Sequence, residues 1–233
     1  MGETVTFASN GSTCHGYLAV PSSGPQAGYG PGVVVIQEWW GLVPHIESIV
    51  DRLADDGFVA LAPDLFHGVK TGEPDEGMRL MMSLAMDTAA QDMAGAAQYL
   101  FEHDATNGSG IGTIGFCMGG SLALWSATLA PNVVAAVGFY PAMPWERMSP
   151  KWPNYAGKSA MIHCSEADGT SAAAGIQQAK EGIEEAGGTV EIFDYPGTDH
   201  AFFNDARPEV YDAENSKLAW ARTLDLLRRR LPA

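Results

Sequence analysis

A cysteine set between glycines is the residue of this chain whose surroundings most clearly suggest chemistry. The segment Gly115-Phe116-Cys117-Met118-Gly119 follows a β-branched run, Ile111 to Ile114, and precedes an apolar segment, Ser121 to Leu129, with helical periodicity. Strand, nucleophile and helix in this order are typical of a nucleophile elbow, a turn so tight that larger residues beside the nucleophile would collide. The start of a helix also favours a thiolate. Cys117 is therefore a candidate nucleophile, and a buried structural cysteine is the alternative.

Three more side chains with useful chemistry each follow a predicted strand. Glu38 comes after the strand 32–36, Asp168 after 159–164, and His200 after 190–195. In open parallel sheets the carboxyl ends of the strands form the site, so these side chains are expected to lie near Cys117. His200 is the expected base for the thiol, and Asp168 would fix its tautomer. The backbone N–H groups of Trp39 and Met118 are the expected oxyanion donors.

Other acids and histidines fit these roles less well. Glu166 and Asp194 compete with Asp168, whereas Asp199 is adjacent to His200, and successive side chains of an extended segment point apart. Among the histidines, His163 is expected in the core, His67 could line a pocket at a strand end, and His15 lies in a predicted hairpin. His45 and His103 lie on predicted helices and fit the role less well.

The order of predicted elements indicates an α/β fold that spans residues 1–233 as a single domain. Two β-like runs, 4–9 and 13–20, are joined by Asn10-Gly11, a strong hairpin signal. From Gly32 onward strands and helices alternate, which predicts a mostly parallel, doubly wound sheet. The expected further strands are 58–62 and 133–139, and the expected helices are 43–55, 76–102 with a break near Asp87, 172–186 and 214–231.

Composition narrows the function classes. The formal net charge of −15 argues against nucleic acid or an anionic membrane as partner. Three widely spaced cysteines without a C-x-x-C pair argue against a disulfide framework or a zinc site and fit a cytoplasmic protein. The glycines from Gly110 to Gly115 spell G-x-G-x-x-G, but they do not open a helix and lack the later acidic residue, so no dinucleotide is expected. Neither a metal nor a cofactor is predicted.

Taken together, these motifs resemble the dienelactone hydrolase (carboxymethylenebutenolidase) family of the α/β-hydrolases across nearly the whole chain. The matching segments are Gln37-Glu38-x-x-Gly41, Ala62-Pro63-Asp64-Leu65, Gly115 to Gly120, Asp168, Gly197-x-x-His200-Ala201-Phe202 and Trp220-x-Arg222-Thr223-Leu224. The resemblance implies a Cys-His-Asp triad of Cys117, His200 and Asp168. It also implies that Glu38 accepts the thiol proton when substrate binds.

One departure from the family bears on the substrate. The family holds the substrate carboxylate with arginines, one of them four positions after the catalytic histidine, and here that position is Asn204. Arg79 could match the other arginine, and Arg207 could replace the missing one. Trp40 is expected to form an aromatic wall, with Phe202, Asn204 and Arg79 as further substrate contacts. The predicted function is a cofactor-free hydrolase of a lactone or small ester, as a monomer or small homo-oligomer. A broader esterase or thioesterase, or a thiol redox or binding protein, is the alternative.

Overall fold

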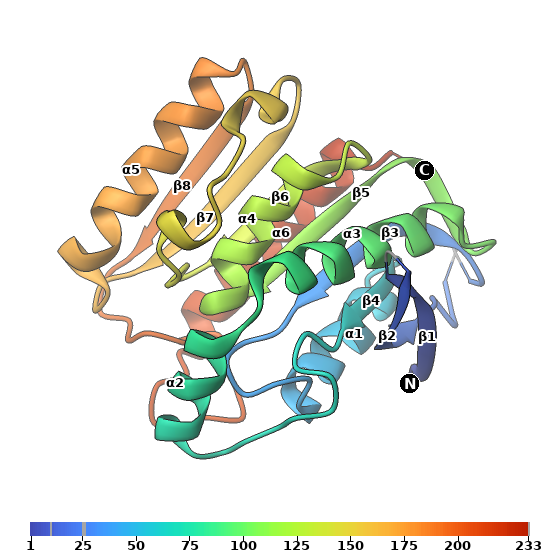
Figure 1. The fold of residues 1–233 in the computed structure, drawn as a ribbon, viewed down its shortest axis with the longest axis horizontal. Coiled ribbons are helices and arrows are strands. Elements are labelled where there is room, and N and C mark those ends of the chain that lie inside the picture. The colour runs from blue at the N-terminus through green and yellow to red at the C-terminus, as the bar shows by residue number, and fades with distance from the viewer. Residues whose placement is uncertain (10, 25–26, 233) are drawn as a thin grey trace.

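A single eight-stranded sheet organises the described part of the chain. The computed structural model describes residues 1–9, 11–24 and 27–232. The strand order is β1-β2-β4-β3-β5-β6-β7-β8 (Figure 1). β2 runs antiparallel to β1 and β4, and the strands from β3 to β8 run parallel to one another, which confirms the predicted mostly parallel sheet. The strands are β1 (Glu3–Ser9), β2 (Ser12–Ala19), β3 (Gly30–Ile36), β4 (Val59–Pro63), β5 (Thr106–Phe116), β6 (Val133–Phe139), β7 (Ser159–Ser165) and β8 (Thr189–Tyr195).

The predicted N-terminal hairpin is present. β1 and β2 pair from Glu3 with Leu18 to Ser9 with Ser12. Gly11 has a φ of 90°, a left-handed conformation that glycine adopts without a steric penalty. Its partner in the predicted turn, Asn10, lies outside the described residues.

Helices cover both faces of the sheet. α1 and α6 share one face, where Trp220 of α6 donates a hydrogen bond to Asp56 at the end of α1, at 2.9 Å. α3, α4 and α5 lie on the opposite face (Figure 1). None of the helices in the described ranges has the length and hydropathy needed to span a bilayer. The helices are α1 (Pro44–Asp55), α2 (Pro74–Ser83), α3 (Met86–Glu102), α4 (Met118–Leu129), α5 (Gly169–Glu185) and α6 (Ala213–Arg230).

Burial explains why the central strands read as continuous apolar runs. Every residue of β3, β4 and β7 is buried, because helices pack on both faces there. α4 is also buried at all positions except Leu129. The apolar character of these segments is continuous in the sequence because almost every residue in them is buried.

The long helix predicted over 76–102 is two helices. α2 and α3 are separated by Leu84 and Ala85, slightly before the break expected near Asp87. Arg147, on a short 3-10 helix after β6, donates to the carbonyl oxygens of Met81, Met82 and Leu84 at 2.8, 3.1 and 3.2 Å. A distant cation therefore satisfies the carbonyls at the end of α2, which is why the position of the break is hard to read locally.

Candidate active site

Cys117 lies at a strained turn between β5 and α4. Its φ and ψ are 55° and −120°, a conformation that a residue with a side chain adopts only where its surroundings enforce it. A Cβ at Gly115 would lie 1.9 Å from the carbonyl oxygen of Gly119, and a Cβ at Gly119 would lie 2.4 Å from that of Gln37. Both glycines are thus required for the backbone to turn back against β3, as the elbow motif predicts.

Replacing Gly115 with alanine is expected to destabilise the fold by more than about 3 kcal/mol, because the clashing atoms are backbone and cannot move aside. Thermal unfolding followed by circular dichroism measures the change. Gly72→Ala is the matched control, because a Cβ there meets nothing within 4 Å. A Gly115→Ala protein with the melting temperature of the control would contradict the close packing of the elbow.

The triad partners predicted from strand ends lie together. His200 Nδ1 is 2.9 Å from both carboxylate oxygens of Asp168, and Ser165 Oγ donates to Asp168 Oδ2 at 2.5 Å. Burial on its own would raise the pKa of Asp168, but the hydrogen bonds from His200 and Ser165 outweigh it and lower the pKa. Asp168 is therefore an ionised acceptor that orients the imidazole.

His200 also interacts with Cys117. Burial disfavours the imidazolium, but hydrogen bonds with Asp168 and Cys117, together with their charges, raise the pKa of His200 to about 10. The Cys117 side chain is nearly buried, with 7% of the residue exposed. His200 therefore binds a proton more readily than an ordinary histidine, at a position beside Cys117.

Glu38 is a buried carboxylate at the end of β3. The residue is 1% exposed, and Oε2 accepts a hydrogen bond from Asn204 Nδ2 at 2.8 Å. Burial raises the pKa of Glu38 even though His45, Asn204, His200 and Arg207 all act to lower it. Within the described residues Oε1 has no hydrogen-bond partner. Asn204, predicted to contact substrate, is thus occupied in holding Glu38.

Tyr140 is a site residue that the sequence analysis missed. It follows β6 with a φ of 38°, is 1% exposed, and packs edge-on against His200 with ring centroids 5.0 Å apart. Burial, together with the charges of Glu38, Cys117 and Asp168, raises its pKa well above the ordinary value, so the phenol stays neutral. Its hydroxyl is buried without a partner among the described residues. Its place directly after a predicted strand was the available signal.

The two predicted oxyanion donors are the backbone N–H groups of Trp39 and Met118. Trp39 follows Glu38 directly, and Met118 is the first residue of α4, next to Cys117. In the part of the chain that the structure describes, neither backbone N–H donates to a turn, loop or side-chain acceptor. Both amides are thus available to an oxygen bound at the elbow.

The structure places some of the predicted substrate contacts near Glu38 and others away from it. Trp40 is half-buried beside Trp39, with ring centroids 5.1 Å apart, and the guanidinium carbon of Arg207 lies 5.9 Å from the Trp40 ring. Arg79, in contrast, has a 77% exposed side chain that pairs with Glu76 on α2. Phe202 is fully buried and packs on Tyr140. The structure therefore brings Trp40 and Arg207 to the site, places Arg79 at the surface, and puts Phe202 behind Tyr140.

The structure also places the histidines that were not predicted to act as the base. His163 is a core residue as predicted: its ring nitrogens contact Tyr195 at 2.7 Å and Thr223 at 3.0 Å, and burial together with Arg222 lowers its pKa to about 3. His67 pairs with Asp92 at 3.1 Å and has a 48% exposed side chain. His45 lies on a helix, α1, as predicted, and it is also one of the groups that act to lower the pKa of Glu38.

The competing acids and the glycine motif take other positions. Glu166 Oε2 accepts from the Gly197 N–H at 2.7 Å, and Asp194 is exposed on β8. The glycines of the G-x-G-x-x-G pattern lie inside β5. No cluster of His, Cys, Asp and Glu with metal-binding geometry occurs among residues 1–9, 11–24 and 27–232.

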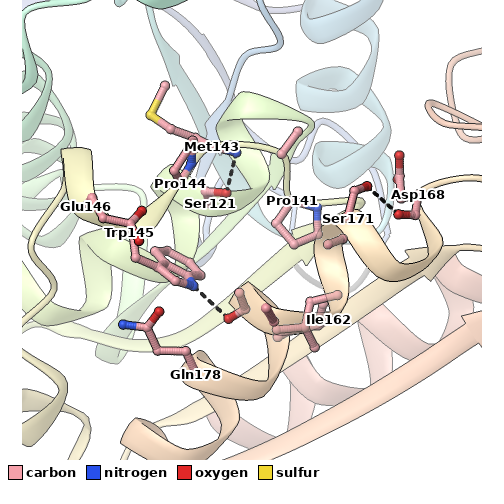
Figure 2. A pocket seen from close by; sticks show the side chains of 15 residues that line it. Ser121, Pro141, Met143, Pro144, Trp145, Glu146, Ile162, Asp168, Ser171 and Gln178 are labelled. Atoms are coloured by element: carbon pink, nitrogen blue, oxygen red, sulfur yellow. Dashed lines mark hydrogen bonds between the residues drawn. The ribbon is translucent and has the colours of Figure 1, made fainter.

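Two cavities adjoin Asp168. One of about 390 Å³ lies between α5 and the segment after β6, with Trp145 and Asp168 among its lining residues (Figure 2). The other, of about 490 Å³, lies on the β8 side and includes Tyr140 and Cys164. Both are lined by Asp168 and Ile176, so the first turns of α5 separate them. Asp168 lines both cavities, whereas Cys117 is not among the lining residues of either.

Known proteins share this architecture over its full length. Residues 14–231 match the model of the dienelactone hydrolase family. The chain is 34% identical to "Protein usf" of Aquifex pyrophilus over 96% of each chain, and 32% identical to an Aquifex aeolicus protein provisionally named carboxymethylenebutenolidase over 98% of each. A Klebsiella pneumoniae crystal structure, provisionally named dienelactone hydrolase, superposes with a TM-score of 0.83 at 25% identity over 98% of both chains. The chain therefore belongs to the dienelactone hydrolase family and is a hydrolase with the α/β-hydrolase fold.

Proposed function

We propose that this hydrolase cleaves a lactone or small ester through an acyl-thioenzyme on Cys117, without a cofactor. The pair of 2.9 Å contacts between His200 and Asp168, next to a cysteine at a strained elbow, supports the proposal most directly. The name carboxymethylenebutenolidase, carried by the Aquifex aeolicus relative, points to a lactone.

The proposed reaction has two halves. The Cys117 thiolate attacks the ester carbonyl carbon, and the carbonyl oxygen becomes an oxyanion that the N–H groups of Trp39 and Met118 stabilise. The C–O bond to the leaving group then breaks, and His200 gives its proton to the departing oxygen. A water molecule, deprotonated by His200, attacks the thioester and releases the acid together with the Cys117 thiolate.

Glu38 is proposed to accept the proton of Cys117 when the thiol is in its neutral form, because the family resemblance implies this role. Its burial supports the role, since a buried carboxylate with a raised pKa binds a proton more readily than an exposed one. Asn204 holds Oε2 and leaves Oε1 free to receive the proton.

Arg207 is the proposed anchor for a carboxylate on the substrate. Within the described residues its Nε donates a hydrogen bond to Glu209 at 2.9 Å, its guanidinium lies over the Trp40 ring, and its charge acts on Glu38 and Tyr140. We expect Arg207→Gln to raise KM about tenfold for a carboxylate-bearing lactone, because a charge-assisted hydrogen bond is lost. A neutral aryl ester serves as control substrate, and its KM should not change. Equal KM changes for both substrates would favour a broader esterase, which the occupied Asn204 amide also allows.

The direct test is to trap the intermediate. The protein is mixed with an activated aryl ester, the reaction is quenched with acid, and the protein is digested. The mass of the peptide that contains Cys117 is then measured by mass spectrometry. The expected result is an acyl adduct on Cys117 that disappears with time. Turnover of the ester with no adduct on Cys117 in a rapid quench, and an adduct elsewhere, would refute the mechanism.

A further inference from the structure

Arg147 holds the end of α2 through three hydrogen bonds. Its Nη1 donates to the carbonyl oxygen of Met81 at 2.8 Å. Its Nη2 donates to the carbonyl oxygens of Met82 and Leu84 at 3.1 and 3.2 Å. The last carbonyls of a helix have no partner within the helix and form the negative end of its dipole, so a cation is well placed there. A side chain from a distant part of the chain therefore caps α2.

α2 has little else to fix its position. Of its ten residues, all of which the structure describes, only Gly77 is buried. Met78 and Met82 are 46% and 60% exposed. A helix in a protein is stabilised mainly by the apolar surface that it buries, and α2 buries little. The hydrogen bonds from Arg147 therefore contribute much of what holds this helix in place.

The buried residue of α2 faces Trp39. A Cβ at Gly77 would lie 3.3 Å from Cγ and Cδ2 of the Trp39 ring and 3.5 Å from the Trp39 carbonyl oxygen. The backbone of the helix thus lies directly against this tryptophan. Thr71, just before α2, adds a second link, because its N–H donates to the carbonyl oxygen of Trp40 at 3.1 Å. α2 and the segment before it therefore cover the two tryptophans that follow Glu38.

The segment that carries Arg147 also contacts the nucleophile elbow. The N–H of Ala142 donates to the carbonyl oxygen of Cys117 at 3.1 Å. The N–H of the next residue, Met143, donates to Ser121 Oγ on α4 at 3.0 Å (Figure 2). One short segment is therefore hydrogen-bonded to the elbow near its start and to the end of α2 near its end.

We propose that Arg147 is a positioning residue: by holding the end of α2, it keeps this helix against Trp39 and fixes the backbone N–H that Trp39 offers to the oxyanion. The inference rests on the hydrolytic mechanism proposed above, in which Trp39 and Met118 stabilise the oxyanion. Arg147 does not touch the reacting atoms. Because an oxyanion donor acts only when it is aligned with the transition state, a loosened α2 lowers kcat and leaves KM almost unchanged.

The first test follows α2 and Trp39 without using activity. The protein is labelled with 5-fluorotryptophan, and the ¹⁹F resonance of Trp39 is distinguished from those of the other tryptophans by its loss in Trp39→Phe. We expect Arg147→Ala to shift or broaden this resonance. Hydrogen exchange measured by mass spectrometry should become at least about tenfold faster in α2 but not in α3, because the lost hydrogen bonds are charge-assisted and act on α2 alone.

Kinetics provide the second readout. Arg147→Ala is expected to lower kcat for the activated ester about ten- to hundredfold, with little change in KM. The probe for the oxyanion is an aryl trifluoromethyl ketone: the Cys117 sulfur adds to its carbonyl carbon, and the C=O electron pair moves to oxygen. Its affinity should fall by the same factor as kcat/KM. Arg147→Lys keeps the cation without the planar fork and should recover part of each loss.

Arg230→Ala is the matched control. Arg230 is half-buried like Arg147, and its Nη2 donates to the carbonyl oxygen of Gly157 at 2.6 Å. Gly157 precedes β7, so this hydrogen bond lies at the opposite end of the strands from the site. The variant should leave the Trp39 resonance, the exchange of α2 and kcat unchanged.

The outcomes separate this inference from the proposed function. Arg147→Ala with wild-type exchange in α2 and a wild-type Trp39 resonance overturns the inference, as does a loosened α2 in an enzyme that keeps its kcat. If Arg147→Ala does not fold, Arg147→Lys decides by the same readouts. A loosened α2 and an altered Trp39 resonance in a protein that never acylates Cys117 would support the anchoring of Trp39 and refute the proposed function.

Discussion

Cys117→Ala is expected to lower kcat for an activated ester by at least about ten-thousandfold, because the elbow then carries no nucleophile. KM should change little, since substrate binding does not depend on the sulfur. Cys117→Ser keeps a nucleophile of similar shape at the same strained turn, so its kcat is expected to lie between those of the wild type and Cys117→Ala. Steady-state kinetics at a fixed pH, with circular dichroism to verify folding, measures the effect.

Cys164→Ala is the matched control for this experiment. Cys164 is also buried near a strand end, but burial raises its pKa to about 12, so it stays a thiol and is not expected to attack an ester. The variant should keep wild-type kcat. If Cys117→Ala retains turnover, the acyl-thioenzyme is wrong. Reversible oxidation of Cys117 in a wild-type protein that shows no turnover would favour a thiol redox protein.

Asp168→Asn should reduce kcat by about ten-thousandfold while leaving the fold intact, because an amide can hold His200 in the wrong tautomer and cannot stabilise the imidazolium. The variant isolates the orienting role from the base itself. Glu166→Gln is the control, since Glu166 is an exposed acid two residues earlier that contacts the Gly197 N–H. Equal losses in both variants would show that His200 does not depend on Asp168.

Asp168→Asn should also change how the stability of the protein depends on pH. The pKa of His200 is raised to about 10 in the folded protein, above its value of about 6.5 in an unfolded chain. The stabilisation from this pair is therefore complete below about pH 6.5 and is lost as the pH rises through about 10. In Asp168→Asn this loss should be smaller, so the melting temperatures of the two proteins should converge as the pH rises.

Much of the site could be predicted because its residues lie at strand ends with strong local signals. The glycines around Cys117 mark a turn that few other residues permit, and the uniformly buried strands β3 and β7 have continuous apolar sequences. Parallel topology then brings the residues that follow the strands to one edge. The prediction therefore needed these local signals and the order of the elements, but no tertiary contact.

The polar surroundings of Glu38 could not be predicted in this way. Asn204 resembled a substrate contact, and His45 fitted less well because it lies on a predicted helix, yet both act on the same carboxylate. Whether a polar side chain faces water or a buried partner depends on tertiary contacts between segments far apart in sequence. The Asn204–Glu38 contact spans 166 residues, and the His45–Asp205 contact spans 160.

The proposed triad joins two regions whose local stabilities are expected to differ. Cys117 precedes α4, which is buried almost throughout, whereas Asp168 precedes α5, where only Ala179 and Ile183 are buried. Segments with few buried contacts open at lower free energy than the global fold. Fraying at the start of α5 would separate the acid from His200 while the sheet stays folded, so heat or mild denaturant should inactivate the enzyme before it melts.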